Sequence, residues 1–400
     1  MTLSYFIPRS LFVILFSIAF IGACSGDQAS PEHEQREQEA GLQIHPQADR
    51  FPHANATTIH TESAKNCDLS NIPPSLERLR TNFDSENEVK VERIPVNVPE
   101  SQSVRLASLS EDLVLILTRR PGLEELSAYH LPTDSTFQLA DRGQGPGELL
   151  FPTDLTVREK EAFVSMGDRR IATFTCEGSS CTHQNDVRTD FQPTSLSAQG
   201  GQFTAMGTLP LRGETALSSL DGAIHRVDAS GTVVDSFGES YQTKAWMVNE
   251  RFTRQGSLTG LSDGAFAVHY DLIPRLYLYG PDGALMDVVE ITEFEQGTFT
   301  YENGHRSVVQ EDTFSRIGHL HTTGDGLLFF TITHREGSMP SQNAEVHLTY
   351  DHYVVRASPT CVSLIGTESI TGESGHRWVP TNHHLLRIKD GSVYLVAPFD

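Results

Sequence analysis

The sequence is poor in basic residues. It contains 30 Lys and Arg against 52 Asp and Glu, and its formal net charge is −22 at pH 7. A protein that binds nucleic acid needs cations to neutralise phosphates, so this balance excludes a nucleic-acid partner. The acidic surplus fits a well-solvated surface or a cationic ligand.

Long apolar runs are also missing. The most apolar run, LFVILFSIAF at residues 11–20, follows Arg9 and is too short to span a bilayer comfortably. It predicts a signal peptide over residues 1–23. Ile21, Gly22, Ala23 and Cys24 resemble a bacterial lipobox, in which the cysteine becomes the first mature residue and carries lipid. The expected location is the cell envelope, with a lipid anchor in a membrane, the outer membrane in a Gram-negative cell. An ordinary secretory peptide is the alternative.

Apolar residues are scarce again over residues 24–66. Such a segment buries too little apolar surface to offset its conformational entropy. It is therefore predicted to be a disordered polar tether between the lipidated Cys24 and a folded domain at residues 67–400.

Cysteine is rare as well, with five in the chain. Besides Cys24 these are Cys67, Cys176, Cys181 and Cys361, an even number that favours two disulfides in an oxidising compartment, with three connectivities open. The short loop CEGSSC favours a bridge between Cys176 and Cys181, which leaves Cys67 to pair with Cys361. A metal or redox site is the alternative, but no second CxxC-type element accompanies these residues.

No long amphipathic helix pattern is present, whereas strand patterns recur along the chain. Six segments are rich in apolar, β-branched or aromatic residues: 111–120, 161–168, 201–210, 264–274, 326–336 and 391–400. Each follows a shorter strand, and three of the turns between them contain Asp-Gly, which supplies the positive φ of a tight hairpin. A second hairpin starts at 171–178, 224–231 and 276–283. Four antiparallel strands repeated in this way predict an all-β fold, a six-bladed β-propeller.

The sixth repeat is incomplete, because the chain ends after two of its expected strands. The isolated strand pattern at residues 87–98 is predicted to pair into the last blade and close the ring. That closure would also bring Cys67 toward Cys361.

A glycine-rich turn joins the predicted outer strand of the first blade, 136–141, to the inner strand of the second, 153–158. Its sequence, GQGPGELLFPTDLTV at 143–157, resembles a GPGE-containing signature of bacterial six-bladed β-propeller lipoproteins, relatives of the NHL and TolB-like propellers. The resemblance covers residues 87–400 and implies the fold and export. It implies no activity, since the family has no agreed one, and the later linkers between blades lack GPGE.

The predicted inner strands carry several candidate ligands of a divalent metal. His319 and His321 lie two apart on the fifth blade and share one side, and His383 and His384 begin the sixth. Together with carboxylates of the second blade, Asp154 and Glu148, they are candidate ligands for a divalent metal that activates a water, as in metal-dependent propeller hydrolases. Hydrogen-bonded strand histidines are the favoured interpretation.

Two further features are candidates for binding. Glu148 either accepts amide N–H groups of the glycine turn, which is favoured, or projects its carboxylate at a ligand. The long connections 241–255 and 293–314 carry a set of side chains suited to a partner surface: Trp246, Arg251, Phe299 and Tyr301. The sequence thus predicts a binding module for an unknown protein or small-molecule ligand at the cell envelope, with a metal-dependent hydrolase or lyase as the alternative.

Overall fold

The computed structural model describes residues 42–44, 57–61, 92–97, 104–199, 202–208, 222–239, 256–261, 264–270, 273–295, 298–302, 305–309, 313–323, 326–336, 347–357, 360–371, 377–389 and 391–398. The chain divides into two units. The smaller contains one sheet with the order β1-β20-β21, formed by β1 (Leu42–Ile44), β20 (Thr298–Glu302) and β21 (His305–Val309). Part of the segment 293–314, predicted as a connecting loop, is therefore a hairpin.

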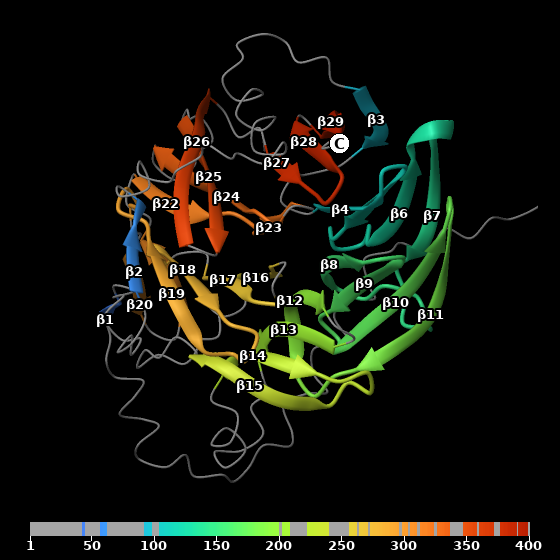
Figure 1. Cartoon of the computed structure of the whole chain (residues 1–400), viewed down its shortest axis with the longest axis horizontal. Helices are drawn as coiled ribbons and strands as arrows, with labels where there is room; N and C mark the ends of the chain where they lie inside the picture. Colours follow the sequence, from blue (N-terminus) through green and yellow to red (C-terminus); the bar gives the residue numbers. More distant parts are fainter. Residues whose placement is uncertain are drawn as a thin grey trace, which may run out of the picture. The chain divides into compact units, whose positions relative to one another are not determined.

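The larger unit is a six-bladed β-propeller, as predicted (Figure 1). Its first three blades are four-stranded antiparallel sheets, each running from the hub outward in chain order. Blade 1 is β4 (Val104–Ser110), β5 (Leu113–Thr118), β6 (Glu125–His130) and β7 (Ser135–Asp141). Blade 2 is β8 (Pro152–Arg158), β9 (Glu161–Met166), β10 (Arg170–Glu177) and β11 (Ser180–Arg188). Blade 3 is β12 (Gln192–Gln199), β13 (Gln202–Thr208), β14 (Gly222–Val227) and β15 (Val233–Glu239).

The other three blades depart from this plan. Blade 4 is β16 (Ser257–Gly260), β17 (Phe266–His269), β18 (Arg275–Tyr279) and β19 (Leu285–Glu290), with β2 (Thr57–His60) added outside. Blade 5 pairs both β22 (Thr313–Ile317) and β23 (His321–Thr322) with β24 (Leu328–Glu336), followed by β25 (His347–Ala357) and β26 (Thr360–Thr371). Blade 6 is β27 (Arg377–Pro380), β28 (His384–Lys389), β29 (Ser392–Pro398) and β3 (Glu92–Asn97).

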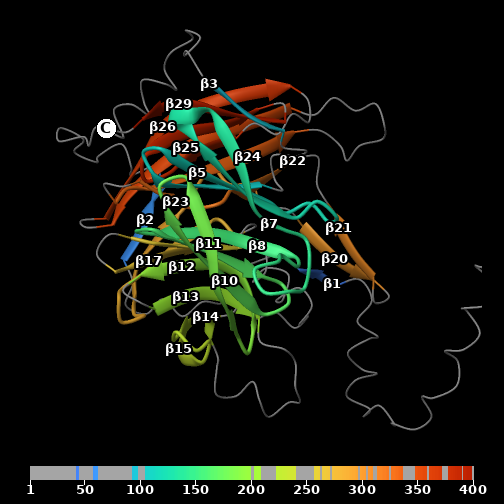
Figure 2. The ribbon, with the colours of Figure 1, turned by 90° about the vertical axis from the view of Figure 1, so that its right-hand side faces the viewer.

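The predicted ring closure is confirmed. Strand β3 pairs antiparallel with β29, and the two lie side by side in both views (Figures 1 and 2). Ile94 of β3 is fully buried, whereas its neighbours Arg93 and Pro95 are exposed. This alternation is that of a strand with one face on the core, and it places Ile94 against Val104 and Leu106 of blade 1.

The order of the strands within blade 6 was predicted wrongly. The sequence pattern predicts the inner strand of blade 6 at His384–Lys389, but the four-residue strand β27 precedes these residues and occupies that position. The chain end therefore supplies three strands, and β3 supplies the one that is missing. Gly391 has a positive φ of 71°, as Gly264 and Gly326 do at 82°. In blade 6 this glycine lies between the second and third strands, whereas in blades 4 and 5 it lies between the first and second.

The tether prediction needs correction at residues 57–61. Strand β2 pairs in parallel with β19 at the outer edge of blade 4. Ile59 packs against the apolar cluster between blades 4 and 5, and the Thr61 hydroxyl contacts that of Thr292 at 3.0 Å. Two threonines and an isoleucine give this stretch strand character, and blade 4 offers an open edge for it to pair with.

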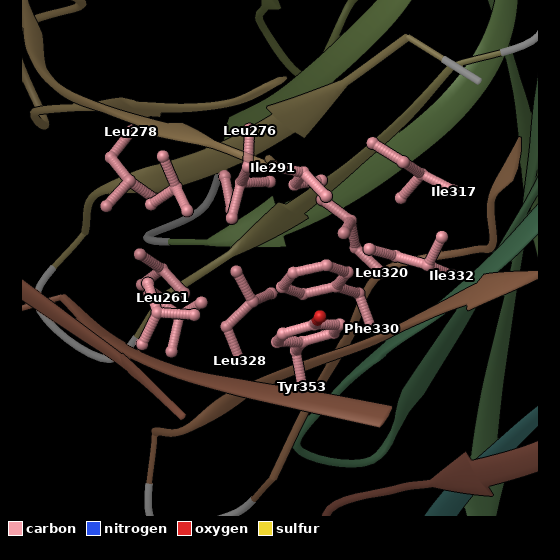
Figure 3. Close-up of a cluster of buried hydrophobic side chains, with 14 of the residues drawn as sticks. Leu261, Leu276, Leu278, Ile291, Ile317, Leu320, Leu328, Phe330, Ile332 and Tyr353 are labelled. Atoms are coloured by element: carbon pink, nitrogen blue, oxygen red, sulfur yellow. The ribbon is translucent and has the colours of Figure 1, made fainter. Parts of the chain in front are cut away.

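The apolar core lies between blades and not within a single sheet. Figure 3 shows the cluster between blades 4 and 5, where Leu276 and Leu278 face Leu328, Phe330 and Tyr353. Equivalent clusters join blade 1 to blade 2, blade 2 to blade 3, blade 5 to blade 6 and blade 6 to blade 1. Between blades 3 and 4, the ring of Phe237 packs against those of Phe266 and Tyr279. Each blade is thus held by its two neighbours, and this packing fixes the inner strands around the hub.

The glycine-rich turn joins β7 to β8, as predicted. Glu148 folds back on it and accepts the amide N–H of Gly145 at 2.7 Å, the local arrangement that the sequence favoured. A Cβ at Gly143 would lie 1.9 Å from the Glu148 carboxylate, so that position tolerates only glycine without rearrangement.

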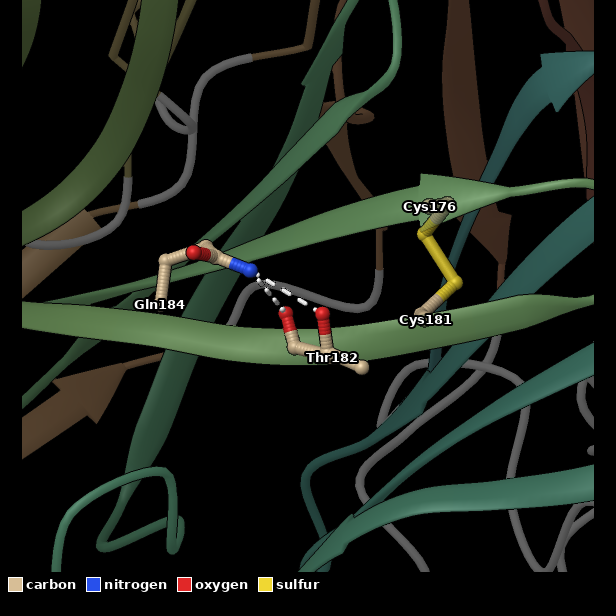
Figure 4. Close-up of a disulfide and its surroundings, with 4 residues drawn as sticks. All are labelled: Cys176, Cys181, Thr182 and Gln184. Atoms are coloured by element: carbon tan, nitrogen blue, oxygen red, sulfur yellow. Dashed lines mark hydrogen bonds between the residues drawn. A yellow bond between two sulfur atoms is a disulfide. The ribbon is translucent and has the colours of Figure 1, made fainter.

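A disulfide joins Cys176 to Cys181, which are directly paired across β10 and β11 at the outer hairpin of blade 2 (Figure 4). Cys361 lies in β26, but Cys67 lies outside the described residues, so their pairing stays a prediction. Cys24 and the signal peptide also lie outside them. In the described part of the chain, no helix has the length and apolar character needed to cross a membrane.

Candidate ligand-binding site at the hub

The inner strands share a two-residue pattern that organises the hub. In each blade a polar residue comes directly before a buried Leu or Trp: Arg105-Leu106, Asp154-Leu155, Ser195-Leu196, Ser257-Leu258, His319-Leu320 and Arg377-Trp378. Successive side chains in a strand point to opposite faces of the sheet. The apolar member therefore packs toward the preceding blade, as Leu155 does in the cluster with blade 1, and the polar member contacts the next blade.

These polar residues bond one blade to the next. Ser195 of blade 3 donates to Asp154 of blade 2 at 2.8 Å and accepts the Leu258 amide of blade 4 at 3.0 Å. The Ser257 hydroxyl of blade 4 accepts the Leu320 amide of blade 5 at 3.0 Å. The repeated pattern thus forms a continuous belt of hydrogen bonds from blade 2 to blade 5 along one side of the hub.

A cavity of about 100 Å³ lies inside this belt. Its charged and imidazole-bearing lining consists of Arg105, Asp154, His319 and His321. Its hydroxyls come from Ser108, Thr156, Thr259, Thr322 and Thr381. Blades 1 to 6 all contribute lining residues. The structure therefore brings together three of the predicted site residues, Asp154, His319 and His321.

Asp154 is the central acid of the site and is 2% exposed. Its Oδ2 accepts the Ser195 hydroxyl and the Leu196 amide, at 2.8 and 3.0 Å. Its Oδ1 lies 3.4 Å from Arg105 Nε in blade 1 and 3.4 Å from His319 Nε2 in blade 5, on the opposite side of the ring. Neither contact is a hydrogen bond, so Oδ1 is buried without a hydrogen-bond partner among the described residues.

Two more arginines stand beside Arg105 at the end of the hub where the inner strands begin. Arg119 follows β5 and donates to the Thr153 carbonyl at 2.5 Å, and Arg377 starts β27 and donates to the Val104 carbonyl at 2.8 Å. We call Arg105, Arg119, Asp154, His319, His321 and Arg377 the hub cluster.

Burial and mutual repulsion perturb the cationic groups of the hub cluster. Burial lowers the pKa of Arg377 to about 9, with repulsion from Arg105 as a second cause and attraction to Asp154 in opposition. The pKa of Arg119 is lowered well below its usual value, first by burial and then by repulsion from Arg105. All three guanidinium groups remain charged at neutral pH.

The two histidines of the hub cluster are neutral at pH 7. Burial is the main cause that lowers the pKa of His319 and His321 well below the usual value, and the nearby arginines lower both further. Their rings are 5.2 Å apart and nearly perpendicular. Each neutral imidazole has one N–H donor and one acceptor nitrogen.

This donor set does not fit a divalent metal. Two imidazoles and one carboxylate are ligands that a divalent metal accepts, but the guanidinium groups near them would repel a cation. No group of three or more His, Cys, Asp or Glu in the described residues is arranged to hold a metal ion.

The remaining predicted site residues do not join the cavity. His384 is 2% exposed, lies in the second strand of blade 6 and contacts the Ser108 hydroxyl at 3.0 Å, and His383 is half-buried beside it. Glu148 is engaged in the glycine turn. Phe299 and Tyr301 lie in β20 of the smaller unit. Trp246 and Arg251 lie outside the described residues.

Sequence analysis missed the three arginines of the hub cluster. For two of them a signal was present, since Arg105 precedes Leu106 as Asp154 precedes Leu155 and His319 precedes Leu320. Aligning the inner strands on that apolar residue places Arg105 at the level of Asp154. Arg377 was missed because β27 was not recognised as an inner strand, and Arg119 has no counterpart in the pattern.

The fold and this site define a six-bladed β-propeller with a charged cavity at its hub. No known protein family and no curated protein matches the chain. Among solved structures, a protein from Bacteroides fragilis described as exported is 12% identical over 70% of this chain and 76% of its own, with a TM-score of 0.43.

Two further solved structures are similar at the same level. A member of the DUF4221 family from Bacteroides vulgatus is 7% identical over 78% of this chain and 98% of its own, with a TM-score of 0.46. Virginiamycin B lyase from Staphylococcus aureus is 11% identical over 76% of this chain and 98% of its own, with a TM-score of 0.38. At these values the similarities carry no argument about ligand, activity or location.

Proposed function

We propose that this protein is an exported, lipid-anchored β-propeller that binds a small ligand in its hub cavity at the cell envelope. The observation that carries the proposal is the hub cavity onto which Arg105, Asp154, His319 and His321 converge from three blades. Buried charged groups with incomplete hydrogen bonding destabilise a fold, and native proteins retain them mainly at functional sites. Export and anchoring rest on the apolar run at residues 11–20 and on Cys24.

The metal-dependent hydrolase or lyase is the weaker alternative, because the guanidinium groups oppose a cation at His319 and His321. A protein partner on the long connections between blades stays a prediction from sequence, since Trp246 and Arg251 lie outside the described residues.

A cavity-filling substitution tests the hub as the ligand site. We expect wild-type protein, dialysed against a small-molecule extract of the cell envelope, to retain a compound detectable by native mass spectrometry. Thr156→Phe places a phenyl group in the cavity lining and should abolish that retention. Thr136→Phe, at an exposed position in the outer strand β7, is the matched control. Equal retention by Thr156→Phe and the wild type would show that the ligand binds elsewhere.

The anchor is tested separately. We expect labelled palmitate to be incorporated into the wild-type protein and to be lost from Cys24→Ser, while Cys67→Ser retains the label. Labelling that survives Cys24→Ser would contradict the lipid anchor and leave the hub untouched.

A further inference from the structure

The hub cluster carries more positive than negative charge, although the whole chain is strongly acidic. Three guanidinium groups face one carboxylate, that of Asp154, and the two imidazoles are neutral, which leaves an excess of two positive charges. In a chain with a net charge of −22, such a local excess is opposite in sign to the background. It concentrates anions at the hub, where low-dielectric walls strengthen the field.

Backbone carbonyls accept hydrogen bonds from all three guanidinium groups. Arg119 and Arg377 each donate to a backbone carbonyl, and Arg105 contacts the Val104 carbonyl at 3.3 Å besides Asp154. The Nε atoms of Arg105 and Arg377 are buried without a hydrogen-bond partner among the described residues. A guanidinium has five donors in a planar fork that matches the oxygens of a carboxylate, sulfate or phosphate.

The cavity beside these groups has room for such a group. Its volume is about 100 Å³, and it is partly open to solvent. A drug-sized ligand needs about 300 Å³ or more. The Thr156 hydroxyl and the mutually hydrogen-bonded hydroxyls of Thr259 and Thr322, 3.2 Å apart, add neutral polar groups to the walls.

We propose that the hub cavity is an oxyanion site, in which Arg105 binds the anionic group directly and Arg119 and Arg377 add to the attraction. The ligand class is a small oxyanion, or a larger molecule that presents a carboxylate, sulfate or phosphate end. The neutral imidazoles of His319 and His321 can each donate one N–H to the same group. This inference rests on the proposed function, because it names the chemistry of the ligand that the hub receives.

Sulfate and acetate are the probes that test it, titrated into the purified full chain at constant ionic strength with chloride as the background. Isothermal titration calorimetry should give saturable binding of one anion per chain. Sulfate also stabilises proteins by general exclusion from their surface, but that effect does not saturate and is common to all variants.

Two substitutions that remove charges of opposite sign make the test specific. Arg105→Gln should weaken anion binding about tenfold or more, because it removes a charge-assisted contact. Asp154→Asn should strengthen binding about threefold or more, because it removes the competing negative charge while keeping an oxygen for Ser195 or Leu196. Arg158→Gln is the matched control at the far end of β8, where Arg158 pairs with Glu161 at 2.6 Å. It should bind anions as the wild type does.

The outcomes separate this inference from the proposed function. Binding that responds to Arg105→Gln and Asp154→Asn in opposite directions supports it, and circular dichroism of each variant excludes a folding defect. Binding that is absent, non-saturable or equal in all variants overturns it. If the wild type then still retains a neutral or cationic compound that Thr156→Phe loses, the hub remains the ligand site and only its chemistry was inferred wrongly.

Discussion

Closure of the ring by β3 makes a quantitative prediction at Ile94. This side chain is fully buried between Val393 of blade 6 and Val104 and Leu106 of blade 1. Ile94→Ala removes three carbons, worth about 0.8 kcal/mol each in transfer free energy, or about 2.4 kcal/mol. The cavity left behind adds to this, so we expect the free energy of unfolding to fall by about 3–4 kcal/mol.

Equilibrium urea unfolding of the full chain measures this loss as a lower midpoint at an unchanged slope. Arg93→Ala, in the same strand but exposed, is the control and should change stability by no more than about 0.5 kcal/mol. Hydrogen exchange should also quicken at the amides of β29 that face β3. If Ile94→Ala destabilises the protein no more than Arg93→Ala, the reasoning about closure is refuted.

Two further predictions concern pH and the glycine turn. Burial lowers the pKa of His225 to about 4 and of His269 to about 3. The unfolded chain therefore binds protons more readily, and stability present above about pH 6.5 should fall by about 2 kcal/mol per histidine at pH 5. Unfolding midpoints at pH 7.5 and pH 5 measure this loss; His225→Gln should reduce it, and an unchanged acid loss would contradict the assignment. Gly143→Ala should destabilise by about 1–3 kcal/mol through its clash with Glu148. The double variant Gly143→Ala with Glu148→Ala should recover part of that loss in thermal unfolding, and simple additivity of the two changes would speak against the clash.

Local patterns predicted the blades because the information for a hairpin is local. Paired strands and their turns lie within a few residues of one another, and positive φ at Gly264 and Gly326 agrees with the Asp-Gly signal. The order of strands in blade 6 was predicted wrongly for two reasons. The inner strand β27 has only four residues, and the Asp-Gly signal of blade 6 falls one hairpin later than in blades 4 and 5. Strand β2 could not be placed, since its parallel pairing with β19 joins segments more than 200 residues apart in the chain.

The hub also depends on contacts between distant segments, which local sequence patterns do not reveal. Histidines two apart on an inner strand are visible in the sequence, so His319 and His321 were found together with Asp154. The charges that decide what the cavity accepts come from elsewhere: Arg105 from the inner strand of blade 1, Arg119 from the residue after β5 and Arg377 from blade 6. Their convergence depends on ring closure, and it changes the expected ligand from a cation to an anion.

An anomalous diffraction experiment with selenate tests the ligand chemistry most directly, because selenate is a sulfate analogue with its own anomalous signal. Crystals of the full chain soaked in selenate should show an anomalous peak in the hub cavity, within hydrogen-bond distance of the Arg105 guanidinium. The same soak of Arg105→Gln crystals should leave the cavity without a peak. Selenate bound only at surface arginines, with none at Arg105, would contradict the oxyanion site.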